Sequence, residues 1–112
     1  MDATLAECVG ILDKWTVESK HLACSLSVNG VCVTCVGAIT HPGPDRFVVR
    51  YETENGACPL TVIILPASAA KFVYHDDREL PEAIAHIAND VVAGIEMIFP
   101  DAAYLLLYEM KD

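Results

Sequence analysis

The dipeptide Asn29-Gly30 constrains this chain more than any other feature, because it marks where the backbone must reverse. Before it, apolar residues alternate with small or polar residues from Leu22 to Val28, which is the pattern of a half-buried strand. Asn-Gly between two apolar runs predicts a type I′ turn, since both residues tolerate positive φ. The segment 31–40 is therefore expected to pair back antiparallel as the second strand of a hairpin.

Further apolar runs continue this pattern as far as Tyr74. Segments 47–52, 60–65 and 71–75 have strand composition, and Asn55-Gly56 provides a second hairpin turn. Gly37 predicts a bend or bulge inside the second strand, and the two prolines in 41–45 predict a loop. Consecutive strands joined by short turns indicate a strongly bent, barrel-like antiparallel meander of about five strands.

Two amphipathic helices are expected to flank the meander. An N-terminal helix is predicted from apolar residues at three- and four-residue steps, with Trp15 placed between helix and sheet. That stripe contains Leu5, Cys8, Val9, Leu12 and Trp15. A long C-terminal amphipathic helix is predicted from a similar stripe. Its members are Ile84, Ile87, Ala88, Val91, Ile95 and Ile98.

The segment 103–110 fits a helix by composition and a strand by alternation, and a final strand is favoured, either added to the sheet or paired with another subunit. Its apolar run is too large to remain in water, which makes Tyr104, Leu105, Leu106, Leu107 and Tyr108 candidates for a homo-oligomer interface. The predicted fold class is α+β, with residues 1–112 forming one domain.

Composition limits the classes of function. The 112 residues carry a formal net charge of −9, which disfavours nucleic acid as a partner. No apolar run is long enough for a membrane span, and no secretory signal begins at Met1. The five cysteines are an odd number at mostly core-like positions, which suits a reducing compartment. We therefore expect a soluble cytoplasmic protein.

Two polar clusters are candidates for chemistry. His75, Asp76 and Asp77 could act as catalytic residues in acid–base chemistry or bind a divalent metal, although carboxylates also favour a helix start. His41, Asp45 and Arg46 could bind a ligand, although the Pro-Gly-Pro between them also reads as a rigid turn.

Known site motifs offer little more. Cys32 and Cys35 have the spacing of a metal or redox pair, but positions three apart on a strand face opposite ways. We find no phosphate loop, nucleophile elbow or zinc-protease motif. No cofactor and no metal are expected.

The order of elements resembles the Sm-like small barrel family over about residues 3–75. The resemblance rests on a helix, a strand leading into Asn29-Gly30, a strand with Gly37, a loop holding Asp45, and the segment 62–66. It implies a shared shape. In that family, loops after the second and fourth strands build the RNA pocket of an oligomeric ring. Here Asp45 is not followed by the family's asparagine, and Pro66 begins the segment where the basic signature is expected, so RNA binding is not implied.

Size, acidity and the order of elements also resemble small acidic secretion chaperones, which are α/β dimers. The sequence favours a non-catalytic homo-oligomeric module that binds a protein or small-molecule ligand. The first alternative is a small-molecule enzyme using the site near His75–Asp77. The second is an Sm-like RNA-binding protein, which the negative charge disfavours.

Overall fold

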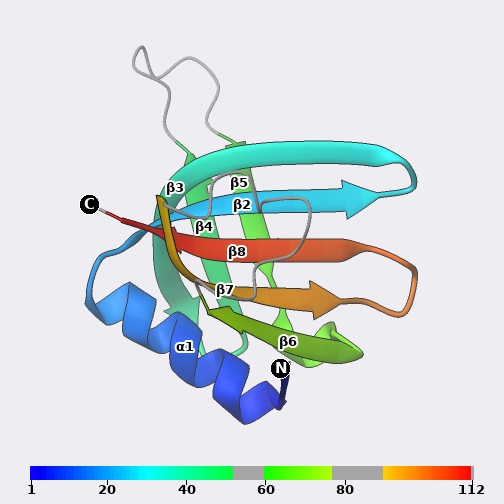
Figure 1. Ribbon diagram of the computed structural model, residues 1–112, viewed down its shortest axis with the longest axis horizontal. Coiled ribbons are helices and arrows are strands. Elements are labelled where there is room, and N and C mark those ends of the chain that lie inside the picture. The colour runs from blue at the N-terminus through cyan, green and yellow to red at the C-terminus, as the bar shows by residue number, and fades with distance from the viewer. Residues whose placement is uncertain (52–59, 77–89, 112) are drawn as a thin grey trace.

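The computed structural model describes residues 1–51, 60–76 and 90–111. In these ranges the chain forms a single antiparallel sheet of eight strands, in the order β1-β6-β7-β8-β2-β3-β4-β5, with one α-helix (Figure 1). The elements are β1 (Asp2–Ala3), α1 (Leu5–Val17), β2 (His21–Val28), β3 (Val31–Gly43), β4 (Arg46–Tyr51), β5 (Leu60–Ile64), the 3₁₀ helix η1 (Pro66–Ser68), β6 (Lys71–Asp76), β7 (Val91–Ile98) and β8 (Tyr104–Met110).

The N-terminal helix α1 is confirmed, and a capping box sets its start. The Thr4 hydroxyl accepts a hydrogen bond from the Glu7 N–H at 3.1 Å, and the Thr4 N–H donates to the Glu7 carboxylate at 3.1 Å. Cys8, Leu12 and Trp15 are buried on its inner face. No helix in the described ranges has the length and apolarity needed to cross a membrane.

The hairpin at Asn29-Gly30 is also confirmed. Asn29 and Gly30 have φ values of 49° and 83°, as a type I′ turn requires, and Val28 pairs with Val31 beyond them. The predicted loop at 41–45 is wrong in part, because β3 continues through Gly43. A register shift between Thr40 and Gly43 accommodates the proline within the strand.

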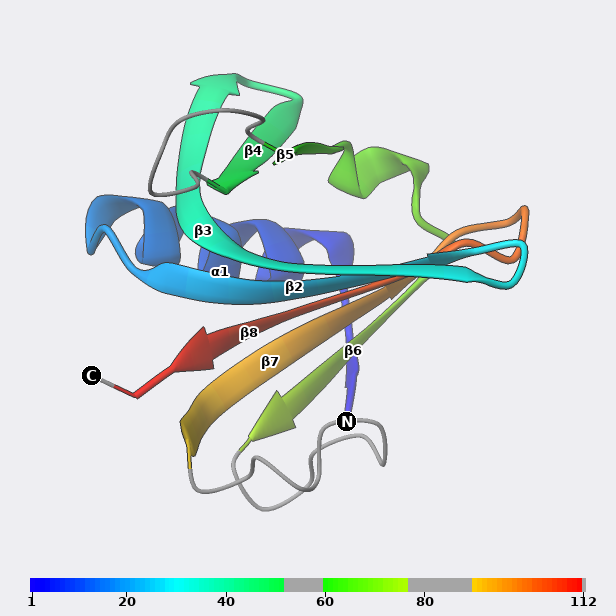
Figure 2. The same cartoon turned by 90° about the horizontal axis from the view of Figure 1, so that it is seen from above.

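β3 is bent and belongs to both halves of the sheet (Figure 2). Its residues up to Ala38 pair with β2, and its residues from Ala38 onward pair with β4. This change of partner occurs beside Gly37, where the sequence predicts a bend. As a result, β4 and β5 run crosswise to β2, β7 and β8 (Figure 1).

The inner faces of the two halves and α1 enclose a shared apolar core. Trp15 is the largest of its fully buried side chains, which confirms its predicted place between helix and sheet. The Trp15 indole N–H donates to the Glu109 carboxylate at 2.9 Å, and the Lys20 ammonium lies 3.5 Å from the same carboxylate. The buried core residues are Cys8, Leu12, Trp15, Leu22, Cys24, Ile39, Phe47, Val49, Val62, Ile64, Phe72, Ile95, Met97, Leu105 and Leu107.

The predicted α+β class with a long C-terminal helix is wrong. The described chain is mostly antiparallel sheet, and Val91–Ile98, the second half of that helix, is the strand β7. Ala93, Ile95 and Met97 alternate toward the core, so a period of two lies within the apparent helical stripe. Hydrogen bonding to β6 and β8 on both sides favours the strand. The first part of the predicted helix, with Ile84, Ile87 and Ala88, lies outside the described residues.

The meander is also shorter than expected. β2 to β5 follow one another in the sheet, but β6 pairs with β1 and β7 at the opposite side and does not contact β5 as a neighbour. The final strand is found as β8, between β7 and β2. Leu105, Leu106 and Leu107 are therefore buried within this chain, and a homo-oligomer through this segment stays a prediction.

We expect Leu12→Ala to lower the free energy of unfolding by about 2 to 5 kcal/mol, because it leaves a cavity at a fully buried position. The matched control is Leu5→Ala on the same helix, where the side chain is exposed, and its effect should stay within about 0.5 kcal/mol. Urea unfolding followed by Trp15 fluorescence measures both. Equal losses in the two variants would contradict the assignment of the inner helix face.

Burial raises the pKa of the Cys8 thiol to about 12. An unfolded thiol ionises near pH 9, so the buried thiol costs no stability below that pH, and stability falls as the pH rises from about 9 towards 12. We expect Cys8→Ala to weaken this alkaline fall. Urea unfolding at several pH values from 7 to 10.5 measures it. The free energy of unfolding that the variant loses through poorer packing is the same at every pH. If the free energy of unfolding changed with pH equally in both proteins, the prediction would be contradicted.

Candidate ligand-binding site

The predicted ligand cluster of His41, Asp45 and Arg46 is divided between two places. His41 lies in β3, where its Nδ1 is 2.9 Å from Asp13 Oδ1 of α1. Its ring stacks on Phe47 with centroids 4.1 Å apart, and its Nε2 is buried without a hydrogen-bond partner. His41 thus attaches the helix to β3 and β4.

Asp45 and Arg46 form an exposed pair at the β3–β4 turn. Arg46 Nε lies 3.1 Å from Asp45 Oδ1, and this hydrogen bond from the guanidinium lowers the pKa of the Asp45 carboxyl. The two residues satisfy one another, and no described contact joins them to His41. As a solvent-exposed ion pair, they contribute little to stability.

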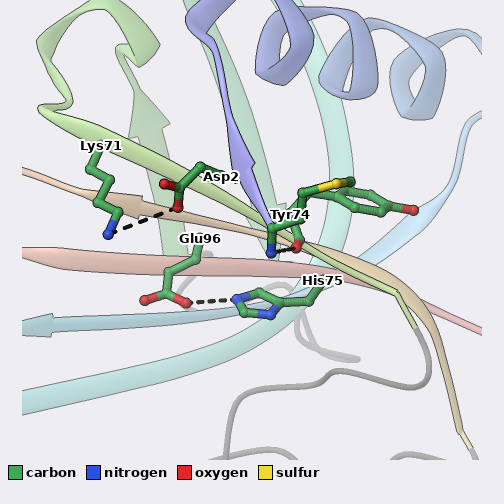
Figure 3. A network of polar contacts seen from close by, with 6 residues as sticks. Asp2, Lys71, Tyr74, His75 and Glu96 are labelled. Carbon is green, nitrogen blue, oxygen red and sulfur yellow. Dashed lines mark hydrogen bonds and ion pairs between the residues drawn. The ribbon is translucent and has the colours of Figure 1, made fainter.

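The second predicted cluster lies at the end of β6. His75 Nε2 is 2.8 Å from Glu96 Oε2 on the neighbouring strand β7 (Figure 3), and both side chains are mostly buried. Burial raises the pKa of Tyr104 to about 12, and the nearby charge of Glu96 adds to the rise. Asp76 ends β6 opposite Ala93, and Asp77 lies outside the described residues. One partner of His75 is thus Glu96, which lies within the segment predicted as the C-terminal helix and is found in the strand β7.

Contacts around this strand hold the N-terminus in place. The Met1 amino group donates to the Tyr74 carbonyl at 3.0 Å, and the Tyr74 N–H donates to the Met1 carbonyl at 2.7 Å. Asp2 lies 3.9 Å from the Lys71 ammonium. Within the described ranges no three His, Cys, Asp or Glu side chains are grouped so that they could hold a metal ion. Catalysis by His75, Asp76 and Asp77 stays a prediction.

A third place, absent from the sequence-based predictions, is a depression on the outer face of the sheet, which we call the outer groove. One part has a volume of about 380 Å³, and its lining residues are His21, Val36, Gly37, Ala38, Thr40 and Arg50. The other part has a volume of about 420 Å³, and its lining residues are Ala23, Thr34, Cys35, Val36 and Tyr108. Val36 lines both parts, so they are neighbours on the sheet, and their lining residues come from β2, β3, β4 and β8.

The strand register explains the basic end of the outer groove. Ala38 of β3 pairs with His21 of β2 on one side and with Arg50 of β4 on the other. These three residues lie in one row across the sheet and on one face. The backbone positions of His21 and Arg50 are therefore about 10 Å apart, with the methyl group of Ala38 between them. Arg50 is exposed and has no hydrogen-bond or ion-pair partner among the described residues. The row therefore places a basic side chain on each side of the small residue Ala38.

Tyr108 lines the other end of the groove. It pairs in register with Ala23 on one side and with Gly94 on the other. A Cβ at Gly94 would lie 3.2 Å from both the Leu107 carbonyl oxygen and the Tyr108 Cβ, so glycine leaves room for the tyrosine. Burial raises the pKa of the Tyr108 hydroxyl, which favours a neutral aromatic side chain at this end.

The sequence could not show this groove because its residues come from four strands that span positions 21 to 108. The available signal was limited to outward-facing Arg50 on a predicted strand. Only the register places Arg50 beside Ala38 and His21. A scan against protein-family models finds no matching family, and searches of curated proteins and of solved structures find no similar protein. The resemblance to the Sm-like family stays a prediction.

We expect Gly94→Ala to destabilise the protein by about 1 to 3 kcal/mol, because the added methyl group meets backbone and Cβ atoms of β8. The matched control is Gly10→Ala in α1, where no heavy atom beyond the adjacent residues and the helix's own backbone lies within 4 Å of the new Cβ. That change should stabilise the helix by about 0.5 to 1 kcal/mol. Thermal unfolding measures both variants. A neutral Gly94→Ala would contradict the close approach of Tyr108.

Proposed function

We propose that the protein is a non-catalytic binding module that holds a small organic anion in the outer groove. The observation that carries the proposal is the row His21, Ala38 and Arg50, in which two basic side chains border one small residue. A guanidinium recognises carboxylate geometry through two parallel hydrogen bonds. The ligand is therefore a carboxylate, with its charged end at Arg50.

The unpaired state of Arg50 supports this proposal. Acidic residues number 16 and basic residues 7 in this chain, so carboxylates are available to pair with most of its basic side chains. Among the described residues, Lys20, Arg46 and Lys71 lie beside the carboxylates of Glu109, Asp45 and Asp2, and Arg50 is the arginine without such a carboxylate. An anion bound at Arg50 would occupy a position that the chain's own carboxylates leave open.

The rest of the groove fits an apolar body attached to the anion. Val36, which is 49% exposed, offers apolar surface between the basic end and Tyr108. The volumes of the two parts, about 380 and 420 Å³, lie in the range of small-molecule sites. An aromatic or branched carboxylic acid would place its ring or chain over these residues.

The test uses benzoate as the probe and benzamide as its uncharged counterpart. We expect benzoate, but not benzamide, to shift the amide resonances of His21, Ala38 and Arg50 in two-dimensional NMR spectra. Arg50→Gln should weaken benzoate binding roughly ten- to a hundredfold, since a charge-assisted hydrogen bond is worth about 1.5 to 3 kcal/mol.

The matched control is Arg46→Gln, which removes an arginine on the same strand but outside the groove. It should bind benzoate as the unmodified protein does. Equal binding of benzoate and benzamide, or unchanged binding by Arg50→Gln, would contradict the proposed function.

A further inference from the structure

We infer that two copies of this chain associate by antiparallel pairing of their β5 strands. β5 ends the sheet order and hydrogen-bonds to β4 alone within the described part of the chain. In an antiparallel edge strand, alternate residues direct their N–H and C=O groups away from the sheet. Another extended strand can hydrogen-bond to these N–H and C=O groups, so the partner expected at this edge is a strand.

The side chains of β5 and of Leu65, which follows it, do not prevent another strand from pairing at this edge. Ile63 is 61% exposed and Leu65 41% exposed, whereas Val62 and Ile64 face the core. Segment 60–65 contains no charged residue and no proline, although these are the usual means of preventing edge-to-edge pairing. The opposite edge differs, because β1 has only two residues and its Asp2 lies 3.9 Å from Lys71.

A second copy of the chain supplies a matching strand, because its own β5 is an uncharged extended segment at the same sheet edge. A two-fold axis brings identical residues of the two copies together, and two chains of net charge −9 repel one another over most of their surfaces. At the uncharged segment 60–65, self-pairing places no like charges side by side. In the proposed register the two-fold axis passes beside Ile63, so the exposed Ile63 side chains of the two copies lie opposite each other and cover one another.

This pairing does not depend on the proposed ligand function. Edge-to-edge association extends the sheet in its own plane, so it leaves the outer groove open on its face. It also differs from the interface expected at Tyr104–Tyr108, since both edges of β8 are already paired within the chain.

The experiment is sedimentation velocity on the full chain over a range of concentrations. A reducing agent is present, because Cys32 is exposed and could otherwise link copies. We expect the unmodified protein to reach twice the monomer mass as its concentration rises. Ile63→Lys should remain a monomer, since two lysines then meet across the strands. The control Val17→Lys, at an 84% exposed position at the end of α1, should still dimerise.

Two variants of opposite charge at the same position distinguish a loss of strand pairing from a loss of folding. Ile63→Lys and Ile63→Glu should each be monomeric, and an equimolar mixture should recover the dimer mass. Amide hydrogen exchange in β5 should slow as the unmodified protein is concentrated. A monomer at every concentration would overturn the inference, and so would a dimer that persists in Ile63→Lys or forms without slower exchange in β5.

Discussion

The bend of β3 joins the two halves of the sheet, and the core depends on it. β3 spans 13 residues and pairs with β2 along its first part and with β4 along its second. Because one strand is shared, the inner faces of both halves face the same apolar interior. An unbent sheet of this size would expose one apolar face far larger than the helix α1 could cover. The bend therefore allows a 112-residue chain with one described α-helix to enclose a core.

Carboxylates then hold the helix against this interior. Glu109 of β8 accepts the Trp15 indole N–H and lies beside the Lys20 ammonium, while Asp13 of α1 lies beside His41 of β3. The two contacts connect α1 to strands in both parts of the bent sheet. Trp15 combines a large buried ring with one polar atom that needs a partner, so the position of Glu109 determines how the helix docks. Some acidic residues of this chain thus have a structural role beyond the charge of its surface.

Local signals in the sequence predict local structure well here. The Asn29-Gly30 turn and the apolar stripe containing Leu12 and Trp15 each depend on residues close together in the chain, and the structure contains both. Val91–Ile98 was assigned wrongly because its apolar residues satisfy a helical and a strand period together. Pairing with β6 and β8 decides between the two, and that information is not local. Likewise His75 and Glu96 lie 21 positions apart, and their contact follows only from the register of β6 with β7.

The path of the chain after β5 connects the outer groove and the open edge. A closed meander would place β6 beside β5, but η1 begins at Pro66 and leads the chain across to β7 and β1. Proline cannot donate a backbone hydrogen bond, so the strand cannot continue pairing through this position. β5 is consequently left at the edge, and the sheet closes around its core without becoming a complete barrel. β4, which carries Arg50, is then next to that edge, with Thr61 of β5 as the pairing neighbour of Arg50. The crossover at Pro66 therefore leaves one sheet edge available for another strand, while the adjacent outer face remains accessible to a ligand.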